Sequence, residues 1–199
     1  MKEKVKIVRM SDGSNIAKNT FYLYSRMICI TVVSLYTSRV ILEILGASDY
    51  GVYQTVGGIV GILAFVNNAL ATGSSRFLTF ELGRGDSGRI TAMFSTLLAT
   101  HILLGVIIII LGEPIGIWYI NSRLNIPEGQ RMVAQIVYQF SLVTTFMNIT
   151  QVPFSAIIIA HENMKIYAYV SLIEVMLKLI IVFLLSFAPG DKLIAYAAL

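Results

Sequence analysis

The sequence is poor in charge: only 13% of its 199 residues are Asp, Glu, Lys or Arg, whereas 56% are hydrophobic. An ordinary soluble domain carries about 25% charged residues, so this chain has too little polar material to cover a water-soluble globule. Its abundance of large apolar residues equally excludes a disordered chain. The sequence therefore predicts an integral membrane protein.

Groups that carry covalent or metal chemistry are also scarce. The single cysteine, Cys29, excludes an intrachain disulfide and a CxxC zinc motif. The two histidines, His101 and His161, lie far apart in sequence without matching ligands. No nucleophile with a base, acidic pair or metal-ligand cluster stands at a workable spacing, so we expect no enzyme, no metal and no other cofactor.

Hydrophobic segments mark the expected membrane spans. Residues 50–75, 90–112 and 132–160 are free of Asp, Glu, Lys and Arg, and each exceeds the roughly 20 residues that cross the hydrocarbon core. Two further spans, about 19–42 and 166–188, contain charged residues, and a sixth, 193–199, is incomplete. The predicted fold is an all-α polytopic bundle of five complete spans and the start of a sixth.

Lysine and arginine are distributed unevenly between the two sides of this predicted bundle. A basic tail over residues 1–18 precedes the bundle, which covers residues 19–199. The tail and the loops on the same side of the predicted membrane hold nine lysines and arginines, whereas the loops on the opposite side hold three. The positive-inside rule therefore predicts a cytoplasmic N-terminus. The longest connection, about 113–132, contains Pro114, Pro127 and Gly129 and is expected to be a loop.

Two arginines fall within the first span. Arg26 lies about 12 Å along this helix, at 1.5 Å per residue, on a partly polar stripe that also holds Thr37. Its side chain is expected either to extend to the cytoplasmic headgroups or to form an anion site in a cavity. Arg39, near the opposite interface, is expected to reach the outer headgroups or to pair with Glu43 at i+4.

The fifth span carries Glu174 and Lys178 in the favourable i,i+4 order, and Tyr167 and Ser171 continue the same face. This pair is expected either to neutralise itself and hold helices together, or to line a polar path in which Glu174 takes part in proton or cation coupling.

The fourth span carries a regular polar strip within an otherwise apolar helix. Its members recur at spacings of three and four residues: Ser141, Thr144, Asn148, Gln151 and Ser155. Such a strip either joins helices or lines a wetted cavity. Pro153 within the strip predicts a kink. In the second span, Gly57, Gly58 and Gly61 form a GxxxG pattern, which predicts close helix packing rather than ligand binding.

The segment Leu35–Tyr53, LYTSRVILEILGASDYGVY, resembles the start of bacterial polysaccharide-repeat flippases, members of the multidrug/oligosaccharidyl-lipid/polysaccharide exporter superfamily. The resemblance continues through VGGIV at Val56–Val60 into SSRFLTFELGRGD at Ser74–Asp86. Within its most recognisable piece, Leu45–Tyr53, a glycine at position 46 is expected to end the first helix.

The resemblance implies two six-helix lobes around a central cavity, in a bacterial cytoplasmic (inner) membrane. Its implied substrate is an undecaprenyl-pyrophosphate-linked oligosaccharide repeat for surface polysaccharide such as O-antigen or capsule. The implied partners are membrane lipids, a polysaccharide polymerase and glycosyltransferases, with no nucleic acid. From the polar strips and the charges within the spans, the predicted substrate-binding residues are Arg26, Thr37, Asn148, Gln151, Glu174 and Lys178, with Arg76 and Arg84 at the cytoplasmic mouth.

By length, the chain corresponds to most of the first lobe, so we expect a fragment, a truncated product or a partial chain. Two alternatives stay open. A multidrug or cation antiporter of the same superfamily would use Glu174 for coupling, although Arg26 would repel a cationic substrate. A non-transporting scaffold for polysaccharide assembly would use the glycine faces. Arg76 and Arg84 also have a simpler explanation as positive-inside residues.

Overall fold

The computed structural model describes residues 2–61, 64–126, 128–185, 187 and 192–198. It is 94% helix and has no strand in the part of the chain that it describes, which confirms the all-α class. The elements are α1 (Lys2–Gly61), α2 (Ala64–Arg84), α3 (Ser87–Ser122), the 3-10 turn η1 (Glu128–Gln130), α4 (Arg131–Ala160), α5 (Met164–Leu185) and α6 (Lys192–Ala198).

Within the described residues, four segments are long and apolar enough to cross a membrane: Ala17–Gly61, Ser87–Ser122, Arg131–Ala160 and Met164–Leu185. The predicted count of five complete spans and the start of a sixth is not confirmed. The predicted second span, 50–75, is divided between the end of α1 and the start of α2, and residues 62–63 between them lie outside the described residues. Polar and charged residues within α2 also lower its hydropathy below that of the other long helices.

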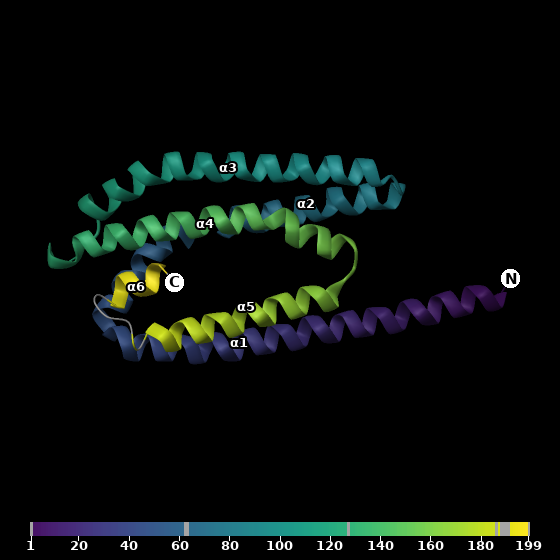
Figure 1. The fold of residues 1–199 in the computed structure, drawn as a ribbon, viewed down its shortest axis with the longest axis horizontal. Coiled ribbons are helices and arrows are strands. Elements are labelled where there is room, and N and C mark those ends of the chain that lie inside the picture. The colour runs from purple at the N-terminus through teal and green to yellow at the C-terminus, as the bar shows by residue number, and fades with distance from the viewer. Residues whose placement is uncertain (1, 62–63, 127, 186, 188–191, 199) are drawn as a thin grey trace.

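The helices form two layers, shown in Figure 1. Helix α5 runs beside the first part of α1, and α2, α3 and α4 make the second layer. Helix α4 is central, because it contacts α1, α2, α3, α5 and α6. The main cluster of buried apolar residues joins the layers at one end, with Ile41 and Leu45 from α1, Ile120 from α3 and Val137 from α4 among its members.

The break in α1 lies at Gly46, as the sequence predicts. Gly46 has φ +78° and ψ 169°, a conformation that is essentially restricted to glycine, and it separates two helical segments. Beyond the break, the Gln130 side-chain amide donates to Asp49 Oδ1 at 2.8 Å. The chain therefore turns at Gly46 and is tied there to the beginning of α4.

Close glycine packing occurs on α3 instead of the second predicted span. A Cβ atom on Gly105 would lie 2.6 Å from the Phe146 ring, and one on Gly116 would overlap the Tyr138 ring. In contrast, no described atom lies within 4 Å of a Cβ built on Gly57, Gly58 or Gly61. The prediction that these three glycines mediate close packing is therefore wrong, because no bulky neighbour meets them.

Helix α3 also extends through residues that the sequence assigned to a loop. It continues past Pro114 to Ser122, which corrects the prediction of a loop from about 113. The extension packs on α4, where the Tyr138 hydroxyl donates to the Gly112 carbonyl oxygen at 2.6 Å. Packing of this kind offsets the backbone hydrogen bond that a proline removes from a helix. Helix α4 likewise continues through Pro153, and Figure 1 shows its last turns angling towards α5.

Candidate functional site

A cavity with both polar and apolar lining residues lies between α1, α2, α4 and α6, with a volume of about 270 Å³. Ser141, Thr144 and Asn148 of the α4 strip line it, which supports the prediction of a cavity wall for this part of the strip. Tyr53 and Asn67 face it from the other helices. Gly57 and Gly61 line the cavity from α1 and add no side chain to it.

The rest of the α4 strip does not line this cavity. Gln151 is exposed and Ser155 half-buried, and neither side chain has a hydrogen bond within the described residues. At the outer end, Gln135 donates to Asn121 Oδ1 at 2.9 Å and Gln139 to Glu113 Oε1 at 3.5 Å. These two glutamines therefore join α4 to the extension of α3.

Arg26 lies on α1 against α5. Its guanidinium carbon is 4.4 Å from the centre of the Tyr167 ring, which is cation–π geometry. Its Nε atom is buried and has no hydrogen-bond partner among the described residues. Thr37, three turns further along α1, likewise has a buried hydroxyl that finds no partner there. The sequence placed Tyr167 on the polar face of the fifth span, but its contact with Arg26 emerges only from tertiary packing.

Glu174 and Lys178 form the predicted ion pair, with 2.8 Å between Lys178 Nζ and Glu174 Oε1. Both side chains are exposed, at 53% and 63%. They lie on the same face of α5 as Tyr167, because seven residues make about two helical turns. Arg39 forms the predicted i,i+4 pair with Glu43, with Nε 3.0 Å from Oε1.

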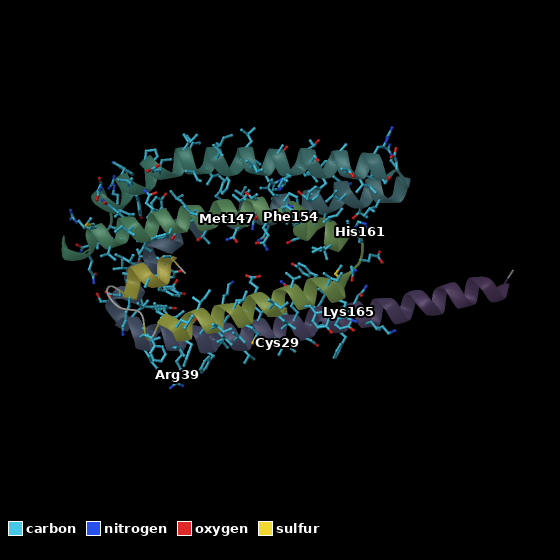
Figure 2. The ribbon with its side chains drawn as sticks, viewed as in Figure 1. Cys29, Arg39, Met147, Phe154, His161 and Lys165 are labelled. Atoms are coloured by element: carbon cyan, nitrogen blue, oxygen red, sulfur yellow. The ribbon has the colours of Figure 1, made fainter. Side chains whose placement is uncertain are left out.

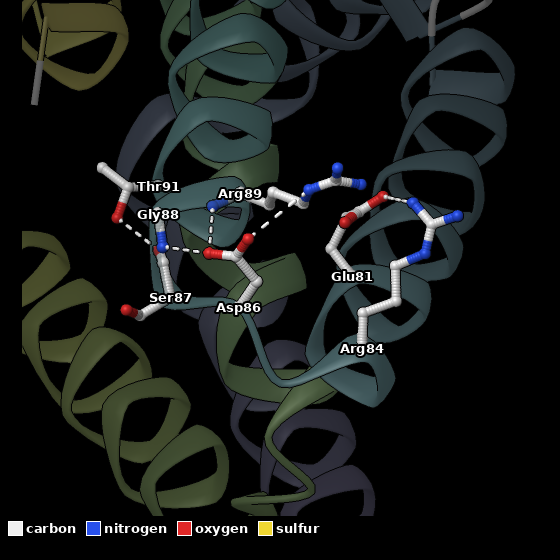
Figure 3. Close-up of polar contacts among 7 residues, drawn as sticks. All are labelled: Glu81, Arg84, Asp86, Ser87, Gly88, Arg89 and Thr91. Carbon is white, nitrogen blue, oxygen red and sulfur yellow. Dashed lines mark hydrogen bonds and ion pairs between the residues drawn. The ribbon is translucent and has the colours of Figure 1, made fainter.

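The predicted mouth residues differ from each other in their contacts. Arg84 donates to Glu81 Oε1 at 3.1 Å and stacks on Phe80. Arg76 is exposed instead, and it lines a second cavity, of about 660 Å³, between α2 and α4. Figure 3 shows Arg84 beside the turn into α3, where Asp86 Oδ1 accepts hydrogen bonds from the backbone amides of Gly88 and Arg89.

Two buried polar residues between α2 and α3 were not identified from the sequence. Glu81 is 8% exposed and its Oε2 has no partner in the described part of the chain. His101 is 2% exposed, with Nδ1 2.6 Å from the Leu97 carbonyl oxygen and Nε2 3.3 Å from Ser74 Oγ. Neither carries a local sequence signal, because burial depends on the helix that packs opposite.

The predicted site residues thus fall into separate groups. Arg26, Thr37, Glu174 and Lys178 lie in the α1–α5 layer, and Asn148 and Gln151 lie on α4 in the other layer. Figure 2 shows these two layers with Cys29 and Lys165 on one and Met147 and Phe154 on the other. Among the residues that the structure describes, no group of three or more His, Cys, Asp or Glu side chains could hold a metal ion.

The four long apolar helices in the described part of the chain indicate a multi-pass membrane protein. Comparisons with known proteins add no closer assignment: no family model matches the sequence, and no curated protein or solved structure matches it.

Proposed function

We propose that this helical bundle is the first lobe of a membrane transporter that moves lipid-linked oligosaccharides with an anionic pyrophosphate from the cytoplasmic to the outer leaflet. In this proposal the second crossing combines the end of α1 with α2, giving five complete spans and the start of a sixth. The N-terminus faces the cytoplasm of a bacterial cell, the bundle lies in its inner membrane, and polysaccharide polymerase and glycosyltransferases are its partners.

One observation carries the proposal: Arg26, within the proposed first span, has an aromatic support but no acidic partner among the described residues. A charged residue inside the membrane is costly, so such residues usually pair with another group or face a water-filled cavity. Within the described residues Arg26 makes no ion pair, and its buried Nε makes no hydrogen bond. Its guanidinium therefore keeps the planar set of donors that binds phosphate oxygens in pairs.

The test compares Arg26→Ala with Arg39→Ala in cells that make the polysaccharide. Arg26→Ala is expected to lower export about tenfold or more, because hydrogen bonds to a charged group contribute about 1.5–3 kcal/mol. Arg39→Ala is the matched control, since that arginine lies on the same helix and is already paired with Glu43. Surface polymer is measured at equal membrane levels of each variant.

The outcomes separate the proposal from its alternatives. Normal polymer from Arg26→Ala at normal protein levels would contradict a phosphate role for this residue. A cation antiporter predicts instead that Glu174→Gln abolishes transport while Arg26→Ala does not. If the protein is instead a scaffold, the amount of surface polymer should depend on whether a variant still binds the polymerase. Loss of the mid-membrane charges should then have no effect on the polymer.

A further inference from the structure

The cavity between α1, α2, α4 and α6 has a mixed polar and apolar lining without a charged side chain among the described residues. Among the described residues that line it there is no Asp, Glu, Lys or Arg, and its polar side chains come from Tyr53, Asn67, Ser141, Thr144, Thr145 and Asn148. Hydroxyls and amides can donate to and accept from the hydroxyl groups of a ligand. They cannot balance a buried ionic charge, so this lining favours an uncharged ligand.

Several of these polar groups have hydrogen-bonding capacity left for a ligand. Asn67 Oδ1 is buried without a partner in the described part of the chain, and a buried acceptor in this state gains by receiving a donor. The side chains of Thr144 and Asn148 are exposed and make no hydrogen bond within the described residues. Ser141 already donates to the Val137 carbonyl oxygen at 2.9 Å, which leaves its hydroxyl oxygen as an acceptor.

The shape of the cavity also limits its occupant. At about 270 Å³ it is just below the size range of drug-binding pockets, roughly 300–1,000 Å³. It can therefore hold one ring rather than a chain of rings. Tyr53, whose ring centre lies 4.7 Å from that of Tyr196, offers an aromatic wall, and Gly57 leaves bare backbone beside it.

We propose that this cavity binds a single uncharged sugar ring, with Asn67, Thr144 and Asn148 holding its hydroxyls and Tyr53 packing on its apolar face. This proposal rests on the proposed transport function for its substrate class, and it assigns the sugar and the pyrophosphate to different places: the sugar to this cavity and the pyrophosphate to Arg26. A bare monovalent cation fits less well, because Val60 and Ile149 also line a volume far larger than a dehydrated ion.

The experiment measures saturation-transfer NMR on the full chain in nanodiscs. The probes are methyl β-glucoside and methyl N-acetylglucosaminide, with glucuronate as a charged analogue of similar size. The two neutral glycosides are expected to receive magnetisation from the protein and to bind about tenfold more tightly than glucuronate, which corresponds to about 1.4 kcal/mol.

Two glycine variants provide a matched pair. Gly57→Leu places a side chain into the cavity and is expected to weaken glycoside binding about tenfold or more. Gly58→Leu lies one position along the same helix, has equally open space, and does not line the cavity, so binding should stay within about twofold. Asn67→Leu is expected to weaken binding like Gly57→Leu, by removing the buried amide oxygen that has no partner among the described residues.

The proposal is overturned if no neutral glycoside receives magnetisation, if Gly57→Leu binds as well as Gly58→Leu, or if sodium displaces the glycosides from the cavity at constant ionic strength. Arg26→Ala should leave glycoside binding unchanged. Failure of export in that variant with retained glycoside binding supports both proposals. Normal export with retained binding removes the phosphate role and leaves the sugar cavity intact.

Discussion

Replacement of Gly116 by alanine should destabilise the contact between α3 and α4. Tyr138 on α4 is 2% exposed, and its ring occupies the space where a Cβ of residue 116 would lie. The ring cannot move aside freely, because its hydroxyl donates to the Gly112 carbonyl oxygen at 2.6 Å. A single added methyl group must therefore displace either the tyrosine or the helix that carries it.

The expected loss of unfolding free energy follows from two costs and one gain. Overpacking a well-packed interface costs about 1–3 kcal/mol. Loss of the Tyr138 hydrogen bond would cost about 0.5–1.5 kcal/mol more, whereas alanine improves helix propensity over glycine by about 1 kcal/mol. The free energy of unfolding should fall by about 1–3 kcal/mol, because the steric cost exceeds the gain in propensity.

The assay is unfolding in mixed micelles by increasing the fraction of dodecyl sulfate, followed by tryptophan fluorescence. Trp118, the single tryptophan, lies two residues from Gly116 and reports on this part of α3. Gly58→Ala is the control, since no described atom lies within 4 Å of its added Cβ. It should be neutral or stabilising by up to about 1 kcal/mol.

A double-mutant cycle tests the stated cause. In a Tyr138→Leu background the ring is gone, and Gly116→Ala should then have little cost. Equal destabilisation by Gly116→Ala in both backgrounds would refute the steric argument, as would a Gly116→Ala protein as stable as Gly58→Ala.

Two further predictions concern the turns at the ends of the bundle. Gly46→Ala should lower the unfolding free energy in the same titration by about 1–3 kcal/mol, because alanine is strained at φ +78° and ψ 169°; an unchanged midpoint would show that the helix break can relax. Asp86→Ala should cost about 0.5–2 kcal/mol by removing the cap of α3. Hydrogen exchange at the Gly88 and Arg89 amides should accelerate in that variant and stay slow in Asp86→Asn, which keeps an acceptor oxygen; similar rates in both would contradict a capping role.

Features that depend on neighbours along the chain could be predicted from the sequence. The all-α class follows from the long apolar segments, and the break at Gly46 follows from local turn chemistry. The pairs Glu174–Lys178 and Arg39–Glu43 follow from the helical repeat, which brings residues four apart onto one face. The same repeat predicted that Ser141, Thr144 and Asn148 share one face of the helix, and of the two roles left open for that face the structure shows a cavity wall.

Features that depend on the opposing helix could not be predicted in this way. Gly57–Gly61 and Gly112–Gly116 both have the GxxxG spacing, yet only Gly112 and Gly116 approach a bulky residue of another helix. Two glycines spaced four residues apart give a helix face without side chains. Tertiary packing determines whether a tyrosine or a cavity lies opposite that face. The extension of α3 beyond Pro114 has the same cause, because contacts with α4 outweigh a local helix-breaking signal.

The polar face of α5 bears on the proposed transport function. Glu174 and Lys178 remain exposed in a part of α5, residues 170–184, whose other exposed residues are apolar, and an ion pair facing lipid would be costly. Tyr167 lies about 10 Å earlier on the same face, at 1.5 Å per residue, and holds the guanidinium of Arg26. We infer that this face meets water or another protein surface rather than lipid. The polar track along α5 begins at Arg26, which has no acidic partner among the described residues. A structural anchor would not need this arrangement, whereas the proposed anion-binding transporter would use it.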